Sequence, residues 1–269
     1  MITSILLSLR EGLEAALIIG IVLGALRRTG RSDLNRSLWM GVLSAVIVSL
    51  LTALLLRAID KELKGSAEQI FEGVTLLLAA GVLTWMIFWM QHQSGSMKSQ
   101  LESNVHRAAN LGGGGALYFL AFISVVREGI ELALYLTAAS LASTAVQTLL
   151  GTSIGLLSAC LLGYLIYSST IRLNLQRFFK VTGLILILFA AGLIAHSVAE
   201  FNEAGIIPAI INPIWNLNSL LNDHSIVGLI ISTLFGYHGN PSLTEALGYC
   251  AYILVTLLVF VKPKNLQAG

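Results

Sequence analysis

The sequence predicts an all-α integral membrane protein with seven transmembrane helices. Charged residues make up only 11% of the chain and the mean hydropathy is +0.82, whereas soluble domains contain about 25% charged residues. A bilayer core of about 30 Å is crossed by roughly 20 apolar residues, and lipid cannot hydrogen-bond an exposed backbone, so long apolar segments are expected to be helices. Such segments lie at about 4–26, 38–57, 69–91, 116–139, 149–168, 181–200 and 244–261.

The lysine and arginine residues of the short loops predict the orientation of these spans. Cytoplasmic loops of membrane proteins are enriched in both residue types. Placing the arginine-rich loop 27–37 in the cytoplasm puts eleven of these residues on that side and three on the other. The N-terminus is therefore predicted to lie outside and the C-terminus in the cytoplasm.

Two copies of one charged pentad occur inside the apolar sequence. Arg10-Glu11-Gly12-Leu13-Glu14 lies in the first span, and Arg127-Glu128-Gly129-Ile130-Glu131 lies 117 residues later in the fourth. Because three crossings separate them, the second copy runs in the opposite direction. This is typical of an inverted-topology repeat, whose substrate site lies at the repeat interface. We predict repeat 1 at about 1–91 and repeat 2 at about 116–200, with spans 1 and 4 face to face.

The residues that follow the second repeat are predicted to form an outer segment and a seventh span. The stretch at about 201–243 contains three of the four prolines and an apolar run, Ile226 to Phe235, that is too short to cross a bilayer. We predict a re-entrant or interfacial segment there, followed by span 7 at about 244–261. All these segments are assigned to one transmembrane domain, residues 1–269.

Each pentad places two carboxylates on one face of its helix. Glu11 and Glu14 are three residues apart, a spacing that brings helical side chains to about 5–6 Å. Glu128 and Glu131 repeat that spacing. Each charge at mid-membrane costs about 2.5–3.5 kcal/mol on insertion scales, and such groups usually mark function. Two pairs on facing helices predict a site of four carboxylates for a hard or borderline metal cation.

Each pentad also places an arginine four residues before its second glutamate. Arg10 is predicted to brace Glu14, and Arg127 to brace Glu131, through ion pairs along the helix. The alternative is that the pentads are only structural ion pairs. That interpretation accounts for one glutamate per helix and leaves the other uncompensated.

Acidic residues gather on the predicted outer side of the membrane. An acidic mouth raises the local concentration of cations, so we predict a cation-guiding role for residues at the outer ends of spans 3 and 6, with solvated helix-end charges as the alternative. His196, one turn before the first acid of span 6, is a weaker candidate ligand. The predicted guiding residues are Glu68, Glu72, Glu200 and Glu203.

Other side chains in the spans are interpreted as packing or interface residues. Small residues recur every four positions in span 1, on the side away from the glutamates, and predict close helix packing. This ridge consists of Gly12, Ala16, Gly20 and Gly24. Met86 and Met90 lie among aromatic residues that include Trp85 and Trp89, which favours packing and interface anchoring over a copper path. Tyrosines near span ends are interpreted as interface residues: Tyr118, Tyr135, Tyr164 and Tyr167.

With both pentads intact, the chain resembles the oxidase-dependent iron permease family, whose mark is an R-E-x-x-E motif in transmembrane helices 1 and 4. The family includes fungal ferric permeases and bacterial EfeU-type permeases. The similarity to the bacterial type extends to further stretches of the chain: Phe71-Glu72-Gly73, 83–90, 171–175, Phe235-Gly236-Tyr237 and Pro241-Ser242.

The resemblance implies an iron transporter, not an enzyme, in the cell inner (cytoplasmic) membrane, with the motif glutamates binding iron. Iron, ferrous or ferric, would be the transported substrate, and no permanently bound cofactor is expected. Bacterial relatives work with a periplasmic iron-binding protein and a haem peroxidase; the other predicted partners are iron and the lipid bilayer, and nucleic acid is not one.

Two other functions remain open at the level of sequence. One is a permease for another heavy metal such as lead, which some members of the family are linked to. The other is a membrane metal-dependent oxidoreductase. Carboxylate-bridged diiron centres usually contain Glu-x-x-His pairs, whereas both motifs here are Glu-x-x-Glu with no histidine near them in their spans.

Overall fold

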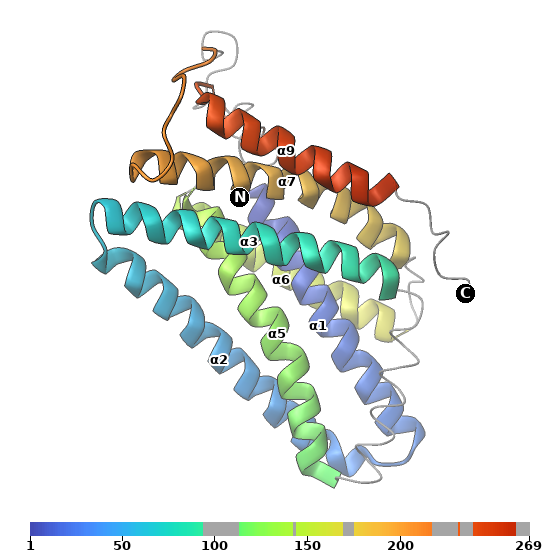
Figure 1. Ribbon diagram of the computed structural model, residues 1–269. Helices are drawn as coiled ribbons and strands as arrows, with labels where there is room; N and C mark the ends of the chain where they lie inside the picture. The colour runs from blue at the N-terminus through green and yellow to red at the C-terminus, as the bar shows by residue number, and fades with distance from the viewer. Residues whose placement is uncertain (94–112, 142–143, 169–174, 217–230, 232–238, 262–269) are drawn as a thin grey trace, which may run out of the picture. The chain divides into compact units, whose positions relative to one another are not determined.

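The described residues of the computed structural model, 1–93, 113–141, 144–168, 175–216, 231 and 239–261, contain helices and no strand (Figure 1). Each of the seven apolar segments predicted from the sequence lies within one α-helix, to within one residue at its ends. The helices are α1 (Ile2–Arg28), α2 (Asn35–Glu62), α3 (Ser66–Gln93), α5 (Gly113–Leu141), α6 (Ala145–Tyr167), α7 (Leu175–Glu203) and α9 (Leu243–Val261).

Within the part of the chain that the structure describes, four helices are long and apolar enough to cross a membrane. Their apolar stretches are Ser32–Asp60, which includes the short 3-10 helix before α2, Ser66–Met90, Ala145–Tyr167 and Arg177–Glu203. Helix α9 is shorter in its apolar part, Leu243–Val259. Helices α1 and α5 have 27 and 29 residues, which is length enough to span, but each carries the three ionisable residues of a pentad. Whether α1 and α5 can cross a membrane therefore depends on the burial of those charges more than on the length of their apolar sequence.

Side-chain caps fix where two of the helices begin. The Thr144 hydroxyl accepts a hydrogen bond from the Gln147 backbone N–H at 3.4 Å at the start of α6. Ser242 and Glu245 form a reciprocal pair before α9, because the Ser242 N–H donates to Glu245 Oε1 at 3.0 Å and the Glu245 N–H donates to Ser242 Oγ at 3.3 Å. Such caps satisfy N–H groups that have no partner within the helix.

The chain divides into two compact units whose boundaries fall inside α3 and α7. Unit 1 consists of Met1–Glu62 and Trp85–Gly183, and it contains both pentads. Unit 2 consists of Leu63–Thr84 and Leu184–Gly269, and it contains the four predicted guiding acids. The predicted apolar run of the outer segment, 226–235, lies outside the described residues except for position 231.

Unit 1 is built on the crossing of α1 and α5, which run in opposite directions (Figure 1). Helix α6 packs along α1, and α2 packs along α5. A buried cluster joins α1, α2 and α5 at one end of the crossing, where Val22 and Leu26 of α1 meet Leu117 and Ala121 of α5 and Leu38 of α2. The antiparallel crossing brings the middle of α1 against the middle of α5, where the two pentads lie.

Unit 1 contains two pairs of parallel helices, α1 with α6 and α5 with α2. The two pairs make contacts at equivalent positions. A Cβ added to Gly151 of α6 would lie 2.6 Å from the carbonyl oxygen of Met1. A Cβ added to Gly41 of α2 would meet the carbonyl oxygen of Tyr118. Tyr118 follows Met1 by 117 residues, which is the spacing between the pentads. Helix α5 therefore packs on α2 as α1 packs on α6.

The glycines of the pentads make a second pair of corresponding contacts. A Cβ on Gly12 would lie 2.9 Å from the Ala159 Cβ of α6, and a Cβ on Gly129 would lie 2.6 Å from the Ser49 Cβ of α2. Ala159 follows Ser49 by 110 residues, and Gly151 of the contact described above follows Gly41 by the same interval. Each pentad thus uses its glycine to approach one neighbouring helix while its glutamates face the other way.

The small-residue ridge predicted on span 1 is confirmed in its first two members, because Gly12 packs on Ala159 and Ala16 on Gly163. The sequence interpretation missed the matching ridge on α6. That ridge has the same four-residue spacing, which is the signal that could have revealed it. Its members are Gly151, Gly155, Ala159 and Gly163.

We expect Gly41→Ala to lower the free energy of unfolding by about 1–3 kcal/mol, the usual result of adding atoms to a filled contact. The new Cβ would meet backbone atoms of α5, which cannot rotate away. Gly24→Ala is the matched control, because a Cβ there has open space within 4 Å and alanine favours a helix. Thermal melts in detergent would measure both, and equal melting temperatures would contradict the packing described here.

Candidate metal site

Three glutamates from the two pentads meet where α1 and α5 cross. Glu11, Glu128 and Glu131 each offer one carboxylate oxygen within 4.8 Å of the other two, and all three side chains are buried. Oxygen ligands lie about 2.0–2.6 Å from a divalent ion, so two of them are at most about 5 Å apart. One cation could therefore contact all three carboxylates.

The fourth motif glutamate, Glu14, lies beside this group of three. Its side chain is buried and interacts electrostatically with Glu128 and Glu131. Its closest described charge partner is Arg10, at 3.4 Å between Oε1 and Nε. The sequence predicted four carboxylates around one point, and the structure places three there with Glu14 adjacent.

Arg10 is enclosed by the first pentad and by α3. Only 1% of its side chain is exposed. Its Nη1 atom lies 3.5 Å from Glu11 Oε1, and its Nη2 atom donates to the sulfur of Met90 at 3.7 Å. With the Glu14 contact, one guanidinium faces two carboxylates. A buried carboxylate needs such a partner, since an isolated charge in an apolar interior is strongly unfavourable.

Arg127 occupies a different environment, although it holds the equivalent place in the second pentad. Its Nε atom donates to Glu131 Oε1 at 2.9 Å, and its side chain is 35% exposed. The guanidinium carbon lies 4.9 Å from the ring centre of Trp89 and 5.6 Å from that of Trp85, which is a cation–π arrangement. The two tryptophans, interpreted from sequence as interface anchors, therefore also hold this arginine.

The charges of the site favour a bound cation. If every group were ionised, the four glutamates and two arginines would sum to −2. The Oε2 atoms of Glu11 and Glu128 are buried and have no hydrogen-bond partner among the described residues. Buried oxygens without partners are unusual in native proteins, and a cation or a proton would satisfy them. Glu14 Oε1 is likewise buried without a hydrogen-bond partner among the described residues, but Glu14 lies outside the group of three, so Glu11 Oε2 and Glu128 Oε2 are the strongest candidate ligands.

Tyr135 is a site neighbour that the sequence interpretation placed wrongly. It was interpreted as an interface residue because it lies toward the end of span 4, but its side chain is 0% exposed. Its hydroxyl lies 3.5 Å from Glu131 Oε2 and 3.8 Å from the sulfur of Met86. The signal was available, because a residue four positions after Glu131 lies on the same helix face.

The four predicted guiding acids gather in unit 2. The carboxyl group of Glu200 is close enough to share a hydrogen bond with Glu72, and it interacts electrostatically with Glu68 and Glu203. The side-chain amide of Gln69 donates to Glu203 Oε2 at 3.2 Å. Segments from α3 and α7 thus form one acidic cluster. His196, the weaker candidate, lies one turn before Glu200 on α7 and is half-buried.

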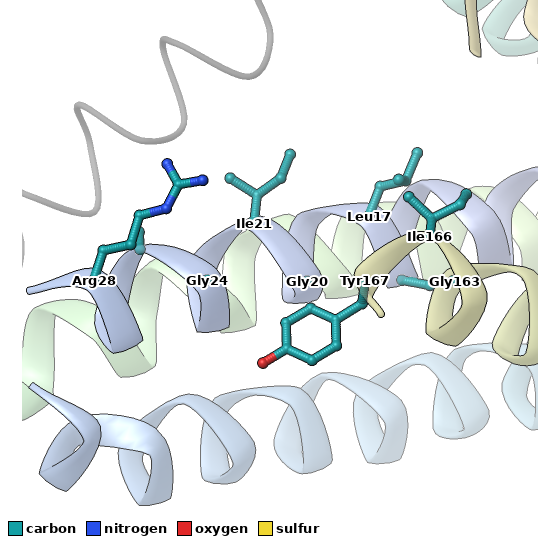
Figure 2. A pocket seen from close by; sticks show the side chains of 10 residues that line it. Leu17, Gly20, Ile21, Gly24, Arg28, Gly163, Ile166 and Tyr167 are labelled. Atoms are coloured by element: carbon teal, nitrogen blue, oxygen red, sulfur yellow. The ribbon is translucent and has the colours of Figure 1, made fainter. Parts of the chain in front are cut away.

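A pocket of about 240 Å³ lies between α1 and α6. Figure 2 shows small residues along it, with Gly20 and Gly24 on α1 and Gly163 on α6. Among the described residues its lining contains no acid, and its polar side chains are Arg28 and Tyr167. This composition does not suit a metal cation, so the buried glutamates are the better candidate site.

Comparisons with known proteins agree over the whole chain. The model of the family described as Iron permease FTR1 family matches residues 1–266. The ferrous iron permease EfeU of Escherichia coli O6:K15:H31 is 37% identical over 270 residues, which cover 100% of this chain and 98% of that relative. The ferrous iron permease EfeU of Yersinia pestis is 34% identical over 271 residues, covering 100% and 96%. No solved structure matches the chain.

We expect Arg10→Met to destabilise the protein more than Arg127→Met. Removing the buried partner of two carboxylates typically costs about 3–5 kcal/mol, whereas Arg127 is partly exposed and its glutamate also has the Tyr135 hydroxyl nearby. Lower pH should partly restore the Arg10 variant, because protonation removes the uncompensated negative charge. Melting temperatures in detergent at pH 5 and pH 8 would test this, and equal losses at both pH values would contradict it.

Proposed function

The chain belongs to the FTR1 iron permease family, and from that premise we propose that it is a high-affinity uptake permease that carries ferrous iron inward across the cell inner membrane. Its family and its several apolar helices make it a multi-pass membrane protein and a transporter, not an enzyme. The ferrous form is proposed because the two relatives described above, matched over 98% and 96% of their length, are named ferrous iron permeases. Iron is the substrate, and no resident cofactor is needed.

The proposed topology has seven spans and an inverted repeat within one permease domain, residues 1–269. Repeat 1 covers about 1–91, repeat 2 about 116–200, an outer re-entrant segment about 201–243 and span 7 about 244–261. The corresponding contacts of α1 on α6 and of α5 on α2 support the repeat, because their members on α1 and α5 are 117 residues apart, as the pentads are, and their members on α2 and α6 are consistently 110 apart. The distribution of lysine and arginine supports an outside N-terminus and a cytoplasmic C-terminus.

The proposed ion site is the glutamate group between α1 and α5. Its single strongest support is the meeting of Glu11, Glu128 and Glu131 within 4.8 Å, from two helices that lie far apart in the sequence. Glu14 would stabilise the ion from beside the group, and Arg10 and Arg127 would orient the carboxylates. Inverted-repeat transporters bind substrate at such a central interface.

Transport requires this site to open, because its carboxylates are at least nine-tenths buried. We propose that the acidic cluster of unit 2 concentrates iron outside, and that rocking of one repeat against the other exposes the central glutamates to each side in turn. His196 could add a nitrogen ligand near that cluster. In bacteria, the resemblance to EfeU-type permeases adds a periplasmic iron-binding protein and a haem peroxidase as proposed partners.

We expect Glu11→Gln, Glu128→Gln and Glu131→Gln each to reduce ferrous iron uptake into proteoliposomes by at least about tenfold, since even a lost hydrogen-bond partner of a metal ligand costs 10–100-fold in affinity. Glu14→Gln should have a smaller effect, because Glu14 lies outside the group of three. Glu62→Gln, an exposed acid at the end of α2, is the control. Supplying ferrous and ferric iron separately would also test the proposed substrate, and unimpaired uptake in all three variants would refute the site.

We expect Glu72→Gln and Glu200→Gln to raise the KM for uptake severalfold and to leave the maximal rate unchanged. A guiding charge acts on local ion concentration, and salt screens it over about 8–10 Å at physiological ionic strength. The difference from wild type should therefore shrink in 1 M salt. A lower maximal rate with the difference unchanged in high salt would instead assign these residues to the transport step.

A further inference from the structure

The hydroxyl of Tyr135 is buried next to the proposed ion site and has few other partners. It lies one helical turn after Glu131, 3.5 Å from the Oε2 atom of that residue, and its remaining described contact is the sulfur of Met86 at 3.8 Å. Thioether sulfur is a weak hydrogen-bond acceptor. Because a buried tyrosine hydroxyl usually finds a partner, the carboxylate of Glu131 is the main acceptor available to it.

In the proposed internal repeat, the position equivalent to Tyr135 packs without a hydroxyl. The position in α1 that corresponds to Tyr135, 117 residues earlier, is Ile18. Ile18 is partly buried against the cluster that joins α1, α2 and α5. The same position of the proposed repeat is therefore filled by an aliphatic side chain in one copy and by a phenol in the other. In both copies this position lies one helical turn after the second glutamate of the pentad.

Because the Tyr135 hydroxyl lies beside it, Glu131 is held more firmly than the other two glutamates of the group, Glu11 and Glu128. Its Oε1 atom accepts from Arg127 Nε at 2.9 Å, and its Oε2 atom faces the Tyr135 hydroxyl. Glu11 and Glu128, by contrast, each have a buried Oε2 atom with no hydrogen-bond partner among the described residues. One ligand of the group is thus fixed on both oxygens, while two keep an oxygen available.

We propose that Tyr135 is a positioning residue for iron: its hydroxyl orients the Glu131 carboxylate so that the ion is bound with higher affinity, and it is not itself a ligand. This inference rests on the proposed function and names a residue outside both motifs. Groups that hydrogen-bond a metal ligand fix its orientation, and their removal typically costs about 10–100-fold in affinity. An oxygen that accepts one hydrogen bond still has a lone pair for the ion.

The test compares Tyr135→Phe with wild type in purified protein, using ferrous iron alone as the probe. We expect the Kd for ferrous iron to rise about tenfold or more, and the KM for uptake in proteoliposomes to rise with it while the maximal rate stays within about twofold. In the Glu131→Gln background, Tyr135→Phe should add no further loss, because the carboxylate that it orients is gone. A melting curve would verify that each variant is folded.

Tyr252→Phe is the matched control. It also removes a partly buried tyrosine hydroxyl, one that lies 2.6 Å from Thr84 Oγ1 within unit 2, whereas both pentads belong to unit 1. Its iron affinity should equal that of wild type. Unchanged affinity in Tyr135→Phe, or an equal loss in Tyr252→Phe, would overturn the inference.

Two further results separate this inference from its alternatives. A visible charge-transfer band with ferric iron that disappears in Tyr135→Phe would make Tyr135 a direct ligand and overturn the positioning role. Absence of iron binding and uptake by the wild-type protein would reject the proposed function itself. Normal wild-type uptake with an unaltered Tyr135→Phe variant would reject only the role of Tyr135.

Discussion

The structure depends above all on the need to compensate charge buried at the crossing of α1 and α5. Six ionisable side chains of the two pentads meet there, and four of them are carboxylates. Each arginine pairs with carboxylates of its own helix, so each pentad brings part of its own compensation into the interior. Each pentad still carries one uncompensated negative charge, and the two charges are brought close together when the helices meet, which couples the assembly of the fold to the presence of a cation or of protons.

Close packing on the opposite faces makes this crossing possible. The pentad glycines let α1 approach α6 and α5 approach α2, because α1 and α5 place no side chain of their own at these two contacts. Helices in membranes gain little from the hydrophobic effect against lipid, so such contacts depend on small residues and van der Waals packing. The glycine of each pentad, Gly12 or Gly129, therefore supports the site as directly as the charged residues do.

Much of this was predictable because lipid leaves the backbone few alternatives. Apolar length gave all seven helices, and the spacing of the pentads predicted which two would meet. What the sequence could not give was the rotation of each helix about its axis. That rotation decides that Glu14 lies beside the group of three and not in it. It also turns Tyr135 inward, although its place near the end of a span favoured an interface.

The two pentads share their arginine, glycine and two glutamates but differ in their surroundings, and this difference has a consequence for transport. Arg10 is fully enclosed, whereas Arg127 is partly exposed and held by two tryptophan rings. Glu131 is contacted on both oxygens, whereas Glu11 and Glu128 each keep one without a partner among the described residues. A carrier that held its ion equally firmly from both repeats would have no preferred way to release it. Under the proposed function, Glu131, contacted on both oxygens, retains the geometry of the site, while Glu11 and Glu128, each with an oxygen that no described residue hydrogen-bonds, are the ligands whose movement opens it.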